Sequence, residues 1–128
     1  MPEFSDAGAT LPAADYERAK GFYSGTLGLE SIMDTAGGAL YRAGSSMVFV
    51  YPSEFAGTNK ATAATFVVAD VPAAVEELRG KGVTFEEYDL PGLKTENGVA
   101  DIEGVKGAWF RDTEDNILAL TEPMAPQG

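Results

Sequence analysis

Hydrophobic and polar residues along the chain follow the same order twice. In each copy a short extended apolar stretch, Ala9–Ala14 or Thr65–Ala69, leads to an aspartate that opens an amphipathic helical pattern. The two aspartates, Asp15 and Asp70, stand 55 residues apart. The apolar stripe of the first helix contains Tyr16, Ala19, Phe22, Tyr23 and Leu27, and that of the second contains Val71, Ala74, Val75 and Leu78. A repeat of this length indicates a duplicated supersecondary unit.

Further strand-like segments follow each helical pattern. They are Ala39–Ala43 and Met47–Tyr51 in the first copy, and Ala108–Asp112 and Ile117–Thr121 in the second. With an extended run after the glycine that closes each helix, both copies predict the order β-α-β-β-β. We expect one domain over residues 1–128, with modules at about 8–52 and 62–123 and a linker at about 52–61 that is rich in turn-forming residues.

Local chemistry supports the predicted helix starts. Asp15 and Asp70 are good N-cap residues, because an aspartate oxygen can accept a hydrogen bond from the exposed amides of the first turn. A second stretch, from Asp89 to Gly104, is predicted to be an irregular loop inside the second module. Leu90 and Leu93 in this stretch would either cap a cavity or anchor the loop to the sheet.

Charge narrows the classes of partner. The chain has 20 acidic and 9 basic residues, a formal net charge of −11, and no histidine. Because nucleic-acid binding depends on neutralising phosphates with Lys and Arg, we expect no nucleic-acid partner. A cationic ligand would be attracted by such a charge. The alternative is that the acidity serves only solubility.

Cysteine usage and hydropathy bear on location. The chain has no cysteine, which is compatible with a reducing compartment. No apolar run approaches the roughly 20 residues of a membrane span, and the first residues do not resemble a signal peptide. The sequence therefore predicts a cytoplasmic protein without a membrane partner.

Three motifs resemble the vicinal oxygen chelate superfamily. They are Leu11–Asp15, Phe22-Tyr23 followed by Leu27-Gly28-Leu29, and Trp109–Leu118. This superfamily contains glyoxalase I, extradiol dioxygenases, fosfomycin-modifying enzymes and bleomycin-binding resistance proteins. The resemblance covers about Ala9 to Glu122 and implies an α+β fold of two tandem modules with curved, cup-shaped mixed sheets. The turn Asp112–Asn116 departs mildly from the usual Asp-Pro-Asp-Gly-Asn.

Metal binding is where the chain departs most from these enzymes. They usually hold a divalent metal with one His, Gln or Glu from each of four strands. Carried over by counting, these positions are Gly8, Phe49, Ala64 and Ala119, none of which has a donor atom. Glu122 lies three residues past Ala119, which places it on the other strand face. We therefore expect no metal and no cofactor.

The residues that share strand parity with these positions predict a mostly apolar and aromatic concave wall. Such a wall suits a small hydrophobic or aromatic ligand. The predicted ligand-binding residues are Met47, Phe49, Tyr51, Phe66, Trp109 and Arg111. Trp109 is equally compatible with a core or dimer-interface position. Val67 has the opposite parity and is expected on a helix-packed face.

The function predicted from the sequence is metal-independent binding of a small molecule, such as sequestration of an antibiotic or metabolite. A homodimer is expected, because members of the family commonly complete their cups across paired modules. One alternative is a lyase, isomerase or dioxygenase-like enzyme, and another is a structural or regulatory module with a filled cup. No catalytic residue is assigned, because nothing in the sequence shows that the candidate groups converge. These groups are the phenols of Tyr41, Tyr51 and Tyr88 and the carboxylates of Glu86 and Glu87.

Overall fold

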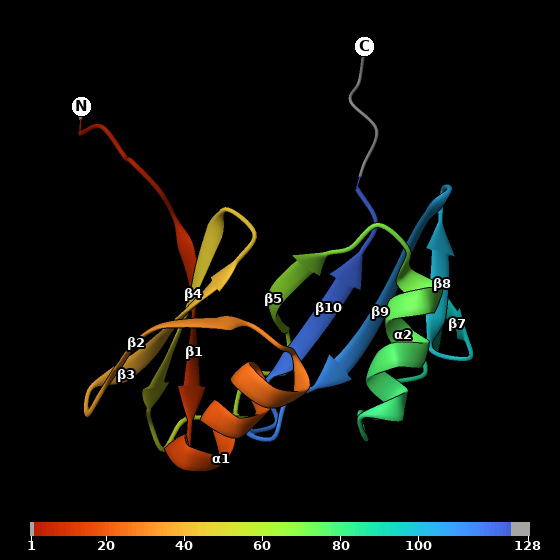
Figure 1. Cartoon of the computed structure of the whole chain (residues 1–128). Coiled ribbons are helices and arrows are strands. Elements are labelled where there is room, and N and C mark those ends of the chain that lie inside the picture. Colours follow the sequence, from red (N-terminus) through yellow and green to blue (C-terminus); the bar gives the residue numbers. More distant parts are fainter. Residues whose placement is uncertain (1, 124–128) are drawn as a thin grey trace. The chain divides into compact units, whose positions relative to one another are not determined.

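A computed structural model describes residues 2–123, and its contacts divide the chain into two compact units. The first unit contains the chain up to Ala63 together with the turn Asp112–Asn116. The second contains Ala64–Arg111 and the chain from Ile117 onwards. Each unit is built on one sheet and is described by itself (Figure 1).

The first unit has a four-stranded mixed sheet in the order β1-β4-β3-β2. Strand β1 pairs with β4 in parallel, and the other pairs are antiparallel. A short helix continues into a π-helical turn between the first two strands. The elements are β1 (Gly8–Ala13), α1 (Tyr16–Lys20), η1 (Gly21–Thr26), β2 (Glu30–Thr35), β3 (Gly38–Ala43) and β4 (Ser46–Pro52).

Alternation along the strands separates a buried face from an open one in this unit. Leu11 and Ala13 of β1 and Val48 and Val50 of β4 are buried, together with Tyr41 of β3. The helical residues Ala19, Phe22 and Tyr23 are also buried, and the Tyr23 ring stacks on Tyr41 with centroids 6.1 Å apart. The predicted helical stripe therefore covers one face of the sheet, and residues of the other parity form the open face.

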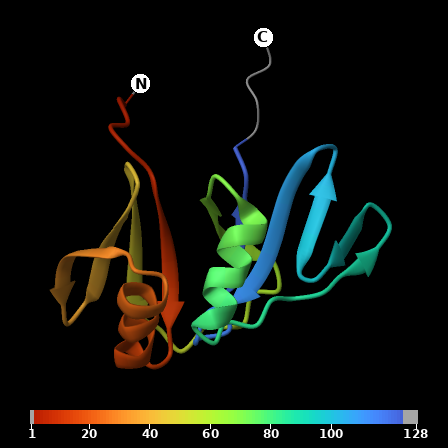
Figure 2. The ribbon, with the colours of Figure 1, turned by 45° about the vertical axis from the view of Figure 1, so that its right-hand side comes forward.

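The second unit has a six-stranded sheet in the order β5-β10-β9-β8-β7-β6. The helix that follows its first strand packs against β8 and β9, as Figure 2 shows for β9. The elements are β5 (Thr62–Val67), α2 (Val71–Gly80), β6 (Asp89–Leu90), β7 (Leu93–Glu96), β8 (Val99–Ile102), β9 (Val105–Arg111) and β10 (Ile117–Thr121). The predicted α+β class with two repeated modules is confirmed, with added strands in the second module.

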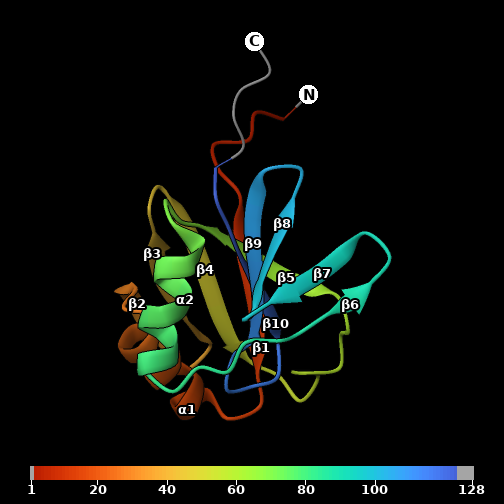
Figure 3. The same cartoon turned by 90° about the vertical axis from the view of Figure 1, so that its right-hand side faces the viewer.

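The stretch predicted as an irregular loop is in fact a meander of short strands. Residues 89–104 form β6, β7 and β8, joined by two-residue turns, and the β6–β7 hairpin extends away from β8 and β9 (Figure 3). Asn97 and Gly98 both have positive φ, at 52° and 81°, as do Glu103 and Gly104, at 53° and 87°. This is the backbone pattern of a type I′ hairpin turn, for which Asn-Gly is a strong sequence signal.

Two further expectations for the second module are wrong. The extended run after Gly82 forms only a single bridge, Phe85 with Phe110, rather than a full strand. Val67 does not face a helix, because its side chain is 65% exposed. The reason is that α2 packs on β8 and β9, whereas β5 lies at the edge of the sheet. Within residues 2–123, no helix is long and apolar enough to cross a membrane.

Candidate functional site: two open sheet faces

Buried carboxylates gather in the turn Asp112–Asn116 of the first unit. The Tyr23 hydroxyl and the Asn116 side-chain amide donate to Asp112 Oδ2 at 2.5 and 2.8 Å, and the amides of Glu114 and Asn116 donate to Oδ1, each at 2.8 Å. Burial, followed by the charge and hydrogen bond of Asp112, raises the pKa of the Tyr23 phenol well above its usual value. Both groups are fully engaged, so the cluster is structural.

Glu114, in the same turn, accepts hydrogen bonds from residues at the start of α1. Its carboxylate accepts the Asp15 amide at 2.7 Å, Arg18 Nε at 2.8 Å and the Thr113 hydroxyl at 2.9 Å. Burial raises the pKa of this carboxyl, but the hydrogen bonds from Arg18, the Asp15 amide and Thr113 outweigh it, so the pKa lies below its usual value. Asp15 itself accepts the Arg18 amide, which confirms the predicted N-cap.

The open face of the first sheet carries three of the residues predicted from the sequence. Met47, Phe49 and Tyr51 alternate along β4 and are half-buried, while the residues between them are buried. The Phe49 and Tyr51 rings are nearly parallel, with centroids 6.3 Å apart and planes inclined by 6°. A Cβ atom on Gly38 would overlap Phe49 Cζ, so the Phe49 ring packs directly on that glycine.

Two members of this face were missed in the sequence. Leu40 pairs with Phe49 across β3 and β4, and Met33 pairs with Leu40 across β2 and β3. Directly opposite residues share a face, so Met33, Leu40 and Phe49 form one apolar row. Met33 was hidden because β2 has a register shift between Ser31 and Met33, which strand parity alone does not reveal.

The open face of the second sheet is centred on Trp109. This residue is half-buried, pairs with Ala119 of β10, and makes an edge contact with the Tyr88 ring at 5.6 Å between centroids. An ideal Cβ on Gly107 would lie 3.8 Å from Trp109 Cη2, so the indole reaches over that glycine. Phe66, on β5 in the same unit, is half-buried.

Arg111 lies two residues beyond Trp109 on β9 and therefore on the same face. Its Nε forms an ion pair with Glu86 Oε1 at 2.6 Å, and both side chains are partly exposed. Glu86 is held in place by its amide, which donates to the Trp109 carbonyl. On this face the Trp109 indole therefore lies near an arginine whose charge is neutralised by Glu86.

The four positions where the resemblance places metal ligands do not fit a metal. Phe49, Ala64 and Ala119 offer no nitrogen or oxygen donor, and Ala119 is buried. At Gly8 an ideal Cβ would lie 2.6 Å from the Met47 carbonyl oxygen, so even a small side chain would require the paired strands to move apart. Among residues 2–123 no group of three or more His, Cys, Asp or Glu side chains is arranged to hold a metal ion.

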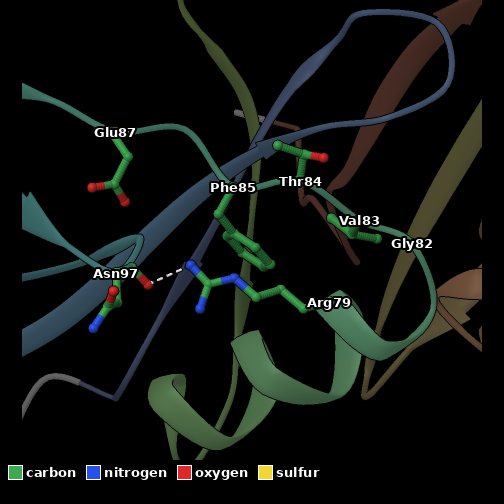
Figure 4. Close-up of a pocket in the computed structure, with 7 residues that line it drawn as sticks. All are labelled: Arg79, Gly82, Val83, Thr84, Phe85, Glu87 and Asn97. Carbon is green, nitrogen blue, oxygen red and sulfur yellow. Dashed lines mark hydrogen bonds between the residues drawn. The ribbon is translucent and has the colours of Figure 1, made fainter.

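A separate hollow of about 490 Å³ lies where α2 ends in the second unit (Figure 4). Arg79 crosses it, donates to the Asn97 carbonyl at 2.6 Å and lies over the Phe85 ring. The hollow is lined by Arg79, Gly82, Val83, Thr84, Phe85, Glu87 and Asn97. None of the residues predicted from the sequence to bind a ligand lines it.

The predicted binding residues thus fall into two sets. Met47, Phe49 and Tyr51 belong to the open face of the first sheet, whereas Phe66, Trp109 and Arg111 belong to the second unit. Strand parity alone was sufficient to predict that Met47, Phe49 and Tyr51 share a face. The partners Met33, Leu40, Tyr88 and Glu86 come from neighbouring segments whose register only the folded chain fixes.

Comparison with known proteins settles the family. The model of the glyoxalase/bleomycin resistance protein/dioxygenase superfamily matches residues 7–119. The chain belongs to this superfamily. The motifs that suggested the resemblance, from Leu11 to Leu118, lie within the matched range. No curated protein sequence matches the chain significantly.

Solved structures of the superfamily share the fold. The bleomycin-binding protein of Streptomyces verticillus, complexed with copper(II)-bleomycin, is similar with a TM-score of 0.73 and 25% identity over 97% of this chain and 100% of that one. Lactoylglutathione lyase from Agrobacterium tumefaciens has a TM-score of 0.65 and 18% identity over 95% and 96%. The fosfomycin resistance protein FosX from Listeria monocytogenes has a TM-score of 0.71 and 12% identity over 96% of each chain.

Proposed function

We propose that this member of the superfamily binds a small hydrophobic or aromatic molecule on its open sheet faces without a metal. The observation that carries the proposal is that apolar and aromatic side chains stand where the family's enzymes have metal donors. In the first unit the centre of this lining is Phe49, which packs on Gly38 and lies parallel to Tyr51. Half-buried aromatic rings beside flexible methionines can adapt to a flat apolar ligand.

The solved relatives add a chemical direction. The neighbour from Streptomyces verticillus is a bleomycin-binding protein whose structure contains copper(II)-bleomycin, so an antibiotic or a similar metabolite is the first ligand to test. The lyase and FosX share only the fold with this chain at their level of identity. Sequestration, rather than turnover, agrees with the buried carboxylates of Asp112 and Glu114, which are already occupied by structural hydrogen bonds.

The proposal is tested by titrating the protein with copper(II)-bleomycin and, separately, with the neutral aromatic dye N-phenyl-1-naphthylamine. Trp109 is the one tryptophan of the chain, so its fluorescence reports directly on the open face of the second sheet. Calorimetry measures binding anywhere on the molecule. Saturable binding of at least one probe supports the function, and the absence of binding by both contradicts it.

Variants localise the binding to the open faces. Replacing Phe49 or Phe66 with alanine should weaken binding by about 2 kcal/mol, roughly thirtyfold, if the ring is a central contact of the bound probe. Phe55→Ala is the matched control in the first unit, because this phenylalanine is 67% exposed and lies outside the sheet. Val67→Ala is the control in the second, since Val67 is exposed on the opposite face of β5. Equal losses of affinity in the variants and in the controls would show that the probe does not bind on the open faces.

Two further expectations accompany the proposal. Elemental analysis of the purified protein should find no stoichiometric transition metal, and one equivalent of zinc or nickel that survives dialysis against chelator would contradict metal independence.

We also expect a homodimer, because pairing would cover exposed apolar surface and sheet edges. Sedimentation that shows only a 13.5 kDa species at micromolar concentration would contradict the dimer.

A further inference from the structure

The open faces of the two sheets carry an arginine at the same structural position. When strands β3 and β4 are aligned with β9 and β10, the pair Leu40–Phe49 corresponds to Trp109–Ala119, and Arg42–Met47 corresponds to Arg111–Ile117. The buried faces support this alignment, because Tyr41 and Phe110 are then equivalent and are 2% and 0% exposed. Gly38 and Gly107, each beneath an aromatic ring, also become equivalent.

Both arginines are paired with a glutamate from the segment that follows the helix of their own unit. Arg42 Nε lies 3.5 Å from Glu30 Oε2, and Arg111 Nε lies 2.6 Å from Glu86 Oε1. Glu30 stands directly opposite Arg42 in the sheet. Glu86 instead lies beside Trp109, because its backbone amide donates a hydrogen bond to the Trp109 carbonyl. The two glutamates are not equivalent positions of the repeat, yet both bring a carboxylate to the equivalent arginine.

We propose that these glutamates, and Glu86 above all, determine which charge a ligand may carry: by neutralising the arginine of the open face they exclude anionic molecules and admit neutral or cationic aromatic ones. The inference rests on the proposed function and specifies its ligand class. Glu86 is a specificity-determining residue in this account, and it acts through the guanidinium of Arg111.

The physical reason lies in competition for the guanidinium. A free arginine beside an aromatic platform is a strong site for a carboxylate, sulfonate or phosphate. With Glu86 already 2.6 Å from Nε, a ligand anion must either displace that carboxylate or remain next to a like charge. The net charge of −11 adds a repulsive field over the whole surface, whereas a neutral ring meets only the apolar lining.

A matched pair of probes tests this directly. The dyes N-phenyl-1-naphthylamine and 1-anilinonaphthalene-8-sulfonate share one ring system, and only the second carries a sulfonate. Each is titrated into wild type, and the ratio of the two dissociation constants is the measured quantity. We expect the neutral dye to bind at least tenfold more tightly than the sulfonate, and in Glu86→Gln we expect this ratio to fall at least tenfold.

Glu87→Gln is the matched control for charge. It removes the same unit of charge one residue away, but Glu87 is exposed and lines the hollow of Figure 4, whereas Glu86 forms the ion pair with Arg111. The ratio should stay within twofold of wild type in this variant. Adding Arg111→Gln to Glu86→Gln should abolish the gain in sulfonate binding, because the guanidinium that would bind the sulfonate is then absent. Circular dichroism and thermal unfolding of each variant establish that it is folded.

The outcomes separate the inference from the function beneath it. If the neutral dye does not bind wild type, the proposed function fails for this probe class and the inference fails with it. If the neutral dye binds but Glu86→Gln leaves the ratio unchanged, or Glu87→Gln lowers it equally, the inference alone is overturned. A fall in the ratio confined to Glu86→Gln and reversed by Arg111→Gln supports it.

Discussion

The turn between β3 and β4 and the turn between β9 and β10 occupy the same place in the two modules, but they are built differently. The first consists of Gly44 and Ser45, both exposed, between the paired residues Ala43 and Ser46. The second has five residues, Asp112–Asn116, of which Asp112, Glu114 and Asn116 are buried. Of the two equivalent turns of the repeat, only the second therefore contains buried polar residues.

The two helix starts show the same asymmetry. At α1 the Asp15 amide donates to Glu114, which also holds Arg18, whereas at α2 the Val71 amide donates to Glu122 at 2.9 Å. Both accepting carboxylates come from the second half of the chain. Since the turn Asp112–Asn116 groups with the first unit, that unit completes its interior with residues that follow it by about 50 positions in the sequence. This difference between the modules leads to four predictions.

The largest effect is expected for Asp112→Ala. The substitution leaves the Tyr23 hydroxyl, two turn amides and the Asn116 side chain without their acceptor, and we expect a loss of about 3 kcal/mol in the free energy of unfolding. Urea denaturation measures it, with Ser45→Ala in the exposed turn as the counterpart that should change stability by less than about 0.5 kcal/mol. Similar losses in both turns would refute the asymmetry.

Glu114→Gln tests the charge of the same turn. A folded-state pKa below the usual value means that the carboxylate stabilises the fold above its unfolded pKa and that this contribution is lost as the pH falls through the folded pKa. The variant should be less stable by about 2 kcal/mol at pH 7. The difference from wild type should shrink below about pH 4.3, where glutamate begins to protonate in the unfolded chain. A difference that is independent of pH would contradict the ionised state of Glu114.

Tyr23→Phe removes one hydroxyl from the cluster and should cost about 1.5 kcal/mol at pH 7. The phenol has a raised pKa in the folded protein, so its contribution is complete below about pH 10, the unfolded value, and is lost as the pH rises through the folded pKa. The wild type should therefore lose stability in alkali faster than the variant. Chemical denaturation at pH 7 and at pH 10.5 measures this, and equal slopes would contradict the buried, neutral phenol.

The smallest effect is expected for Glu122→Gln at the start of α2. The carboxylate accepts a hydrogen bond from the Val71 amide, and the neutral amide oxygen of glutamine can still accept it, so the loss of stability should be below about 1 kcal/mol. Asp70 remains the N-cap of this helix through its bond with the Ala73 amide. Thermal unfolding of Glu122→Gln beside Glu114→Gln compares the two helix starts, and a larger loss at Glu122 would reverse the comparison.

Predictions from local patterns succeeded where one segment determines its own structure. Asp15 and Asp70 were correctly placed as N-caps, because capping depends on residues within a single turn. The stretch 89–104 was wrongly taken as irregular, although Asn97-Gly98 and Glu103-Gly104 have a conformation that fixes a hairpin locally. That error could have been avoided from the sequence, since the Asn-Gly signal was present.

The sequence by itself determined the β-α-β-β-β order of the first module, the strand and helix that open the second and its last two strands, the missing metal donors, and the shared face of Met47, Phe49 and Tyr51, since spacing and residue chemistry decide each of these. The tertiary structure alone decided that Val67 is exposed, that Met33 joins the open face, and that Glu86 pairs with Arg111. Strand parity defines two faces but does not say which one a helix covers. Likewise, contacts between segments 25 or more residues apart depend on strand register, which the packing of the whole unit sets.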